Sequence, residues 1–178
     1  MKMYWPVPQS YSREIPEEGV SSFWKNRKDR YHCGVDIYAP PHSSVIAIEN
    51  CEVIERGIFT SPQIFKHWKE TYYVLVKNLT GLFVRYAELS EIWVEEGAKV
   101  KGGNEIGRIG KVIDEERLEN APDYIKNLVK EKRTSMLHIE VYSKKPEKSN
   151  LYIGGNWFSD KKPEGILNPV DYLRKCIY

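Results

Sequence analysis

The stretch VEEGAKVKGGNEIGRIG, Val94–Gly110, decides the fold class of this chain. Its apolar residues and glycines recur every three residues, at Val94, Gly97, Val100, Gly103 and Ile106. A period of three fits neither a helix nor a strand. A helix would also lose about 1 kcal/mol for each interior glycine relative to alanine. The stretch therefore predicts short strands that bend sharply, as at the corners of a folded-over sheet.

Short β-type segments flank this stretch on both sides. β-Branched and aromatic residues are frequent in three of them, Val45–Gly57, Tyr72–Asn78 and Leu82–Leu89. Ser135–Ser143 alternates strictly between two faces. Leu137, Ile139 and Val141 form one face, and Met136, His138, Glu140 and Tyr142 form the other. We therefore predict an all-β fold, a compact sandwich-like barrel of short, bent strands.

One segment, Asp114–Lys132, departs from the β pattern. Its apolar residues are spaced for one helical face, and Pro122 suits the start of a second helix after Asn120. We therefore expect one helical insertion near 114–132, packed through a single face. Residues 1–30 are rich in proline, serine and charge, and they read as an extended lead-in that belongs to a single domain over 31–178.

The composition argues against several classes of protein. The formal net charge is +2, with acids and bases interleaved along the chain, so we expect no nucleic-acid partner. No apolar run approaches the roughly 18 residues that a transmembrane segment needs. The N-terminal sequence MKMYWPVPQS lacks an apolar signal region, which predicts a cytoplasmic protein as written. The cysteines Cys33, Cys51 and Cys176 form no CxxC pair, which favours buried thiols or a reducing compartment.

Three residues suggest a metal site. His32 and Asp36 lie in HCGVDI, where a straight strand would hold them ~13 Å apart. Gly34 lies between them and allows the backbone to bend, which would bring imidazole and carboxylate together. His138, on the polar face of its strand, can supply a third ligand. Two imidazoles and a carboxylate form an open Zn²⁺ site, whereas the bare spacing also fits ordinary polar strand residues.

Three blocks of sequence carry a resemblance to a known family. In chain order they are HCGVDIYAPPHSSVIAIENCEVI, YAELSEIWVEEGAKVKGGNEIGRIG and LHIEVY. Together they resemble the lysostaphin-type zinc metallopeptidases, which cut peptide cross-links in bacterial cell walls and have a duplicated hybrid motif fold. The resemblance runs from about Trp5 to Leu173. It implies that His32, Asp36 and His138 bind zinc, that the ligand or substrate is a peptide or peptidoglycan, and that the protein acts outside the cytoplasm.

The chain departs from that family at both catalytic histidines. Met136 stands at the first histidine of the family's HxH motif, and a thioether cannot act as a general base. Glu88 stands at the histidine of the YAHL motif. Glutamate serves as the base beside zinc in the unrelated HExxH peptidases, so Glu88 is our candidate catalytic residue. Its alternative is a solvated or salt-bridged strand residue. His42 and His67 are possible substitutes, and each also fits an exposed loop histidine.

Three functions follow from these residues. The first is a divergent zinc peptidase that polarises the scissile carbonyl and activates water, with Glu88 as base. The second is an inactive zinc-binding module on the same scaffold, which binds cell-wall peptide or a protein partner. The third is a biotinyl or lipoyl carrier, because VEEGAKVKGG also resembles those domains. Such carriers present a modifiable lysine at the tip of a hairpin, but the only MKM here lies at 1–3, where no hairpin can form.

The charged insertion stands where the family has a short loop. It either covers the cleft or forms a surface helix with no role in binding.

Overall fold

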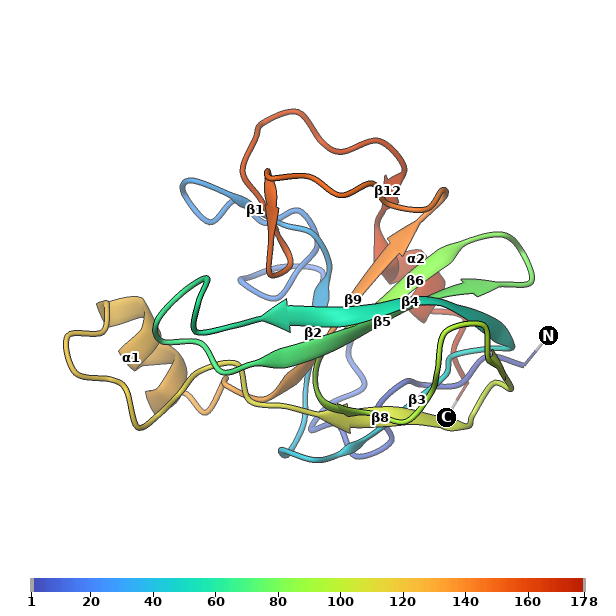
Figure 1. Cartoon of the computed structure of the whole chain (residues 1–178), viewed down its shortest axis with the longest axis horizontal. Coiled ribbons are helices and arrows are strands. Elements are labelled where there is room, and N and C mark those ends of the chain that lie inside the picture. The colour runs from blue at the N-terminus through green and yellow to red at the C-terminus, as the bar shows by residue number, and fades with distance from the viewer. Residues whose placement is uncertain (1, 178) are drawn as a thin grey trace.

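The computed structural model describes residues 2–177, which form antiparallel β structure with two short helices (Figure 1). The strands are β1 (Tyr31–His32), β2 (Val35–Tyr38), β3 (Ser44–Ile46), β4 (Cys51–Thr60), β5 (Thr71–Asn78), β6 (Phe83–Ile92), β7 (Lys99–Val100), β8 (Glu105–Ile109), β9 (Met136–Tyr142), β10 (Tyr152–Ile153), β11 (Asn156–Trp157) and β12 (Ile166–Leu167). The helices are α1 (Asp123–Lys130) and α2 (Pro169–Leu173). The prediction of an all-β fold is confirmed.

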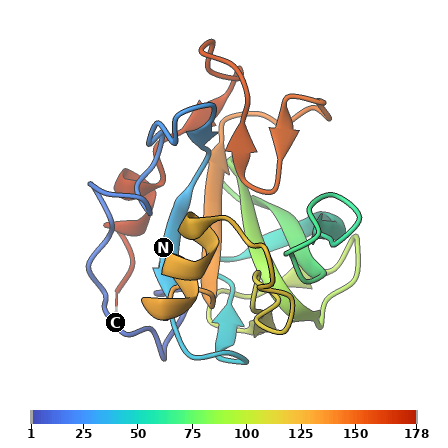
Figure 2. The same ribbon diagram turned by 90° about the vertical axis from the view of Figure 1, so that its left-hand side faces the viewer.

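A nine-stranded sheet forms the body of the molecule, with β6 and β9 side by side within it. One edge of β6 pairs with β5. The other edge pairs with β9 as far as Ala87 and with β8 from Leu89 onward. Strand β9 likewise pairs with β6 on one edge, and with β2 and then β12 on the other. Because strands change partner along their length, the sheet folds over on itself (Figure 2).

The glycine-rich stretch behaves as the sequence predicts. It contains the short strands β7 and β8, which pair with different parts of the sheet. Gly97 and Gly103 have φ angles of 81° and 87°, in the left-handed region that glycine adopts at little cost. The two glycines therefore mark the turns on either side of β7.

The two faces of β9 are both buried. Its apolar residues Leu137, Ile139 and Val141 lie in the main hydrophobic core. Its other face carries His138 and Glu140, which are 2% and 0% exposed. A strand with one polar face usually turns that face to solvent. Burial of this polar face therefore shows that other elements cover it.

A three-stranded sheet, in the order β1-β11-β10, contributes to that cover. The lead-in packs with the domain, since Trp5 and Val7 lie in the main core and Tyr4 bridges Ile177 near the C-terminus. Ser22, later in the lead-in, is also buried. In Figure 1 the small sheet lies above the body of the molecule, beside the blue loop that ends the lead-in before β1, whereas the chain starts at the N label on the right.

The insertion is less helical than the sequence suggests. Helix α1 covers only its second part, and the residues before it form turns. Asn120 has a left-handed backbone (φ 57°), and Pro122 disfavours helical geometry at the residue before it, so the helix starts after Pro122. The insertion packs through Ala121 and Ile125 on Val112 and Ile113, at one end of the molecule (Figures 1 and 2).

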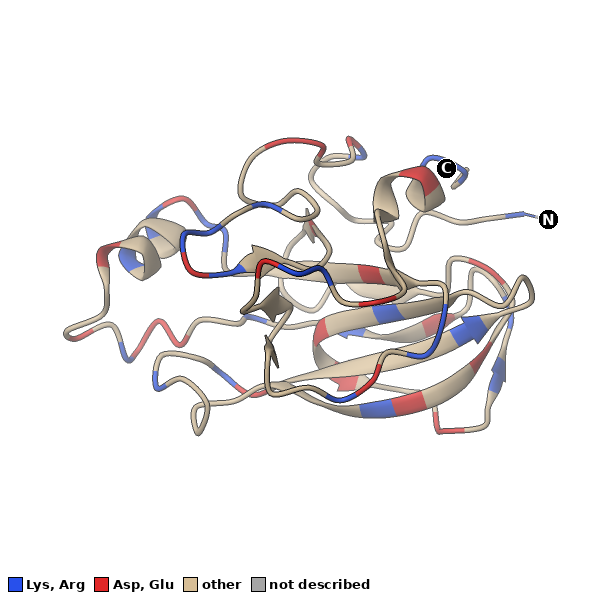
Figure 3. Ribbon diagram, turned by 90° about the horizontal axis from the view of Figure 1, so that it is seen from above, with Lys and Arg blue, Asp and Glu red and all other residues tan. Residues whose placement is uncertain are grey.

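Basic and acidic residues are interspersed over strands and loops (Figure 3). Within residues 2–177, neither helix has the length and apolar character that crossing a bilayer requires.

Candidate metal centre

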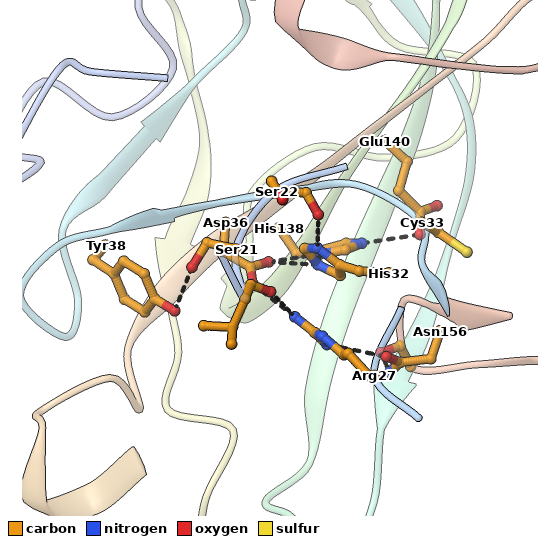
Figure 4. A network of polar contacts seen from close by, with 12 residues as sticks. Ser21, Ser22, Arg27, His32, Cys33, Asp36, Tyr38, His138, Glu140 and Asn156 are labelled. Atoms are coloured by element: carbon orange, nitrogen blue, oxygen red, sulfur yellow. Dashed lines mark hydrogen bonds and ion pairs between the residues drawn. The ribbon is translucent and has the colours of Figure 1, made fainter. Parts of the chain in front are cut away.

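Three of the predicted site residues come together in one buried group. His32 Nε2 lies 3.1 Å from Asp36 Oδ1 and 3.1 Å from His138 Nδ1, and His138 Nδ1 lies 2.8 Å from Asp36 Oδ1 (Figure 4). Among the described residues, these three form the one group of histidine, cysteine and acidic side chains with atoms close enough to share a metal ion. The group is almost wholly enclosed, because its members are 1%, 4% and 2% exposed, respectively.

The junction between the two sheets produces this convergence. His32 ends β1 in the small sheet, Asp36 lies in β2 of the large sheet, and Asp36 pairs directly with His138 on β9. The chain leaves one sheet and enters the other at residues 33–34. A Cβ on Gly34 would lie 2.2 Å from the carbonyl oxygen of Ile139, so only glycine fits. Gly34 is thus required by the close approach of β9.

A backbone carbonyl sets the orientation of His32. Its Nδ1 lies 2.9 Å from the carbonyl oxygen of Ser22 in the lead-in. A carbonyl only accepts hydrogen bonds, so the proton of the neutral imidazole is on Nδ1. The unprotonated Nε2 then faces Asp36 and His138. The lead-in therefore fixes the tautomer of the first candidate ligand.

A buried carboxylate sets the orientation of His138 in the same way. His138 Nε2 donates to Glu140 Oε1 at 3.0 Å, which leaves Nδ1 toward His32 and Asp36. Glu140 also forms an ion pair with Arg85 at 2.7 Å. Our sequence reasoning assigned no role to Glu140 or Arg85. The alternation of β9 placed Glu140 on the face of His138, and this was the signal available for finding it.

The pKa values follow from burial and from these contacts. Burial, with smaller contributions from the charges of Arg27 and His138, lowers the pKa of His32 against the effect of Asp36. Burial also acts to lower the pKa of His138. The hydrogen bonds to Asp36 and Glu140 outweigh burial at His138 and raise its pKa to about 10. Burial acts to raise the pKa of Asp36, but the two histidines hold it well below its usual range. Without a metal ion, the positive charge of the group therefore lies on His138 and the negative charge on Asp36.

The donor set fits zinc. One ring nitrogen of each imidazole and a carboxylate oxygen of Asp36 lie around the same point. Once His138 Nδ1 gives up its proton, each of these three atoms can offer a lone pair to a cation there. Ligands at ~2.0–2.2 Å around a tetrahedral zinc lie roughly 3.3–3.6 Å from one another. The separations of 2.8–3.1 Å among these three atoms are close to that arrangement.

Glu88 lies at the point where β6 changes partner from β9 to β8. Tyr73 pairs with Ala87 and Tyr72 with Leu89, so Glu88 is the extra residue of a β-bulge, and its φ angle is 66°. Bulges re-aim side chains and are frequent beside active sites. The Glu88 side chain is buried, and its Oε2 has no hydrogen-bond partner.

The electrostatics of Glu88 connect it to the group of three. Burial raises the pKa of Glu88 to about 8. The Asp36 carboxylate adds to that rise, and His138 opposes it. Glu88 is therefore a buried residue close to the candidate ligands, and not a solvated strand residue.

The other predicted positions lie as follows. Met136 is buried on β9 opposite Tyr38 and, by the alternation of the strand, on the face of His138. His42 is exposed in the turn between β2 and β3, with a φ angle of 64°. His67 is buried, and its Nδ1 lies 2.7 Å from the carbonyl oxygen of Arg117 in the insertion. Neither His42 nor His67 belongs to the group of three.

Arg27 closes the group from the side of the lead-in. Its Nη2 lies 3.4 Å from Asp36 Oδ2 and 2.6 Å from the Val20 carbonyl oxygen, and its Nη1 donates to Asn156 at 3.0 Å (Figure 4). A cavity of about 330 Å³ lies beside Asp36, between lead-in residues 11–16 and β2. Arg27 was also missed by our sequence reasoning, because it lies within a charge-rich segment with no distinguishing pattern.

Several solved structures have a fold similar to that of this chain. The chain is similar to the catalytic domain of lysostaphin from Staphylococcus simulans, at 17% identity and a TM-score of 0.52 over 90% of this chain and 92% of that domain. It is similar to a structure of the SpoIIQ-SpoIIIAH pore forming complex, at 20% identity and a TM-score of 0.56 over 99% and 93%. A zinc containing peptidase from Vibrio cholerae matches at 20% identity and a TM-score of 0.50, over 79% of this chain and 36% of that one.

Two further comparisons concern the sequence itself. A search of curated protein sequences found no match. A scan against protein families matched residues 30–150 to peptidase family M23. That match covers more than half of the chain, including His32, Asp36, Glu88 and His138, so the chain belongs to peptidase family M23.

Proposed function

We propose that this protein is a zinc-dependent peptidase with a weakened active site, acting on peptides of the cell-wall type. His32, Asp36 and His138 would hold the ion, because their converging lone pairs fit it. Family membership and the zinc containing peptidase from Vibrio cholerae support the metal, and the similarity to lysostaphin supports the substrate class. A cell-wall substrate would place the protein outside the cytoplasm, against the prediction from its N-terminal sequence.

Glu88 is the residue that we assign to proton transfer. Bound zinc would supply Lewis-acid chemistry, polarising a peptide carbonyl and lowering the pKa of water. Glu88 would accept the proton of the attacking water at Oε2 and return it to the leaving amine. A pKa of about 8 lies near neutral pH, which suits a group that both accepts and donates a proton.

The single observation that carries this proposal is the unpartnered Oε2 of Glu88. Leaving a buried acceptor without a partner typically costs about 1–3 kcal/mol, and the left-handed backbone of Glu88 adds strain. An inert strand residue would gain nothing from either cost. A carboxylate that binds water or substrate in the working enzyme explains both.

Weak activity follows from Met136 and from the enclosure of the site. Met136 supplies no proton-transfer group where the family has a histidine, and a missing general base or acid typically costs about 10²- to 10⁴-fold in rate. Substrate must also displace lead-in residues that now cover the ligands, and a cavity between the lead-in and β2 reaches Asp36. We therefore expect cleavage far slower than that of ordinary family members.

A second candidate is a zinc-binding module without catalysis. It is favoured by the contact of Arg27 with Asp36 and by the burial of all three candidate ligands. Such a module would bind peptide or a protein partner through its surface. The similarity to the SpoIIQ-SpoIIIAH complex is compatible with a role in protein assembly.

Cleavage of glycine-rich and cell-wall peptides by the zinc-loaded protein tests the two candidates. The peptidase proposal expects slow cleavage that Glu88→Gln abolishes at unchanged zinc content. Glu88→His combined with Met136→His should raise the rate, because it restores the family's histidines. Cleavage by neither the wild type nor the double variant would favour the module, and cleavage that survives Glu88→Gln would show that another residue is the base.

A further inference from the structure

Glu140 is fully buried and accepts four hydrogen bonds. Arg85 Nη1 and the Tyr142 hydroxyl donate to its Oε2, both at 2.7 Å. The Tyr152 hydroxyl donates to its Oε1 at 2.7 Å, and His138 Nε2 donates to the same oxygen at 3.0 Å. A carboxylate has about four acceptor sites, so Glu140 is fully satisfied in its ionised form. Arg85 and His138 lead the contacts that lower its pKa to about 2 against the effect of burial.

The four donors come from three different elements. Arg85 lies on β6 and pairs directly with Glu140 across the strands. Tyr142 and His138 lie on β9 with Glu140 itself, and Tyr152 lies on β10 of the small sheet. The hydroxyl of Tyr152 therefore links the small sheet, which also carries His32, to the face of β9 that carries His138.

Arg85 is held in place by aromatic rings as well as by Glu140. Its guanidinium carbon lies 4.8 Å from the ring centre of Tyr152, 5.1 Å from that of Tyr73 and 5.7 Å from that of Tyr142. Cation–π contacts of this kind are strongest where the cation has lost its water, and Arg85 is 8% exposed. The Arg85 guanidinium is therefore held in place against Glu140.

We propose that Arg85, Tyr142 and Tyr152 act through Glu140 as positioning residues. By fixing Glu140, they keep the His138 ring oriented with Nδ1 toward the place where His32, Asp36 and His138 would hold the metal ion. This inference rests on the zinc site of the proposed function. Removing the carboxylate charge would free the His138 ring to take its other tautomer or to rotate, and either change removes the lone pair from the site. Partners of this kind typically change metal affinity by about 10- to 100-fold when lost.

The alternative is a buried ion pair that only stabilises the fold. A second buried carboxylate in this chain gives the matched comparison. Glu49 accepts from the Tyr172 hydroxyl at 2.7 Å and from Asn78 at 2.7 Å. The Tyr172 and Tyr152 hydroxyls thus each donate at the same distance to a buried carboxylate. Only Tyr152 is connected to a candidate metal ligand.

The test compares Tyr152→Phe, Glu140→Gln and the control Tyr172→Phe in the full chain. Zinc affinity is measured by competition with a chromophoric chelator, and the visible absorption bands of bound cobalt(II) report ligand geometry. We expect Glu140→Gln to weaken zinc binding about 10- to 100-fold and to shift the cobalt bands. Tyr152→Phe should do so to a smaller extent, and Tyr172→Phe should change neither while lowering thermal stability to a similar degree.

The outcomes separate this inference from the proposed function. A wild-type protein that binds no zinc would overturn both. Wild-type zinc binding that is unchanged in folded Glu140→Gln and Tyr152→Phe would overturn the positioning role alone. Equal losses in Tyr152→Phe and Tyr172→Phe would do the same, because they would show a general effect of stability. If Glu140→Gln fails to fold, the two tyrosine variants still decide the question.

Discussion

Asp36 and His138 face each other directly on neighbouring strands, and Asp36 Oδ1 lies 2.8 Å from His138 Nδ1. A cross-strand pair of this kind is fixed by the register of β2 on β9, because a slip by one residue would turn both side chains to the opposite face. The register of the main sheet therefore fixes the positions of two of the three candidate ligands. The third, His32, arrives from the small sheet.

Zinc should bind and stabilise the protein. With free zinc at about 100 times its Kd, the folded state gains about 2.7 kcal/mol, which corresponds to a rise in Tm of roughly 5–10 °C for a chain of this size. Elemental analysis should give one zinc per chain, and calorimetry should show the rise in Tm. Both effects should disappear on treatment with a chelator and in His138→Ala. Equal zinc content in the wild type and His138→Ala would exclude this residue as a ligand.

Gly34→Ala should damage both the fold and the site. Its Cβ would meet the Ile139 carbonyl oxygen at 2.2 Å and His138 at 2.9 Å, so β9 must shift. Overpacking of this kind costs about 1–3 kcal/mol. Gly57→Ala is the control, since its Cβ would meet only the side chain of Tyr73, at 3.0 Å. Denaturant unfolding should show a larger loss for Gly34→Ala, with loss of zinc binding in that variant alone.

Stability of the zinc-free protein should fall with rising pH because of Glu88. Its folded-state pKa, raised to about 8 by burial, exceeds the ordinary value of 4.5. The folded state therefore binds the proton more tightly, and this contribution is lost between about pH 4.5 and pH 8, by up to about 1.4 kcal/mol per pH unit. Glu88→Gln should flatten the profile in that window. A wild-type profile that does not differ from that of the variant would contradict the burial of this carboxyl.

Arg27→Ala should open the site from the side of the lead-in. It removes the contact with Asp36 and the hydrogen bonds to Asn156 and Val20. We expect zinc to transfer to a chelator about tenfold faster, since a loss of about 1.4 kcal/mol in the barrier is a factor of ten. Arg30→Ala is the matched control, because Arg30 pairs only with Asp29 and the Phe158 ring among the described contacts. The same transfer rate in both variants would remove Arg27 from any gating role.

Local pattern was enough for the strands, because each depends on a short stretch of chain. The candidate ligands also needed the resemblance to the lysostaphin-type metallopeptidases, because the spacing of His32 and Asp36 alone fits ordinary polar strand residues as well. The alternation in Ser135–Ser143 and the glycine spacing in Val94–Gly110 report backbone geometry directly. The length of α1 was overestimated, because Asn120 adopts a left-handed backbone that the apolar spacing of the insertion does not reveal.

The surroundings of the ligands could not be predicted, because they depend on pairing between distant segments. Arg85 meets Glu140 across 55 residues of sequence, and Arg27 meets Asn156 across 129. Neither pair has a local signature. The bulge at Glu88 arises where β6 leaves one partner strand for another, which is a property of the folded sheet.

The junction at residues 33–34 joins the small sheet to the large one directly beside the candidate ligands. His32 Nε2 contacts Asp36 and His138, so the small sheet cannot lift away without breaking those contacts. Short strands at the edge of a domain commonly form a separate cooperative unit that opens before the rest. Amide hydrogens in β1, β10 and β11 should therefore exchange with solvent as a set, and a cation bound between the sheets would slow their exchange together. The lifetime of the bound ion would then equal the interval between openings of that small sheet.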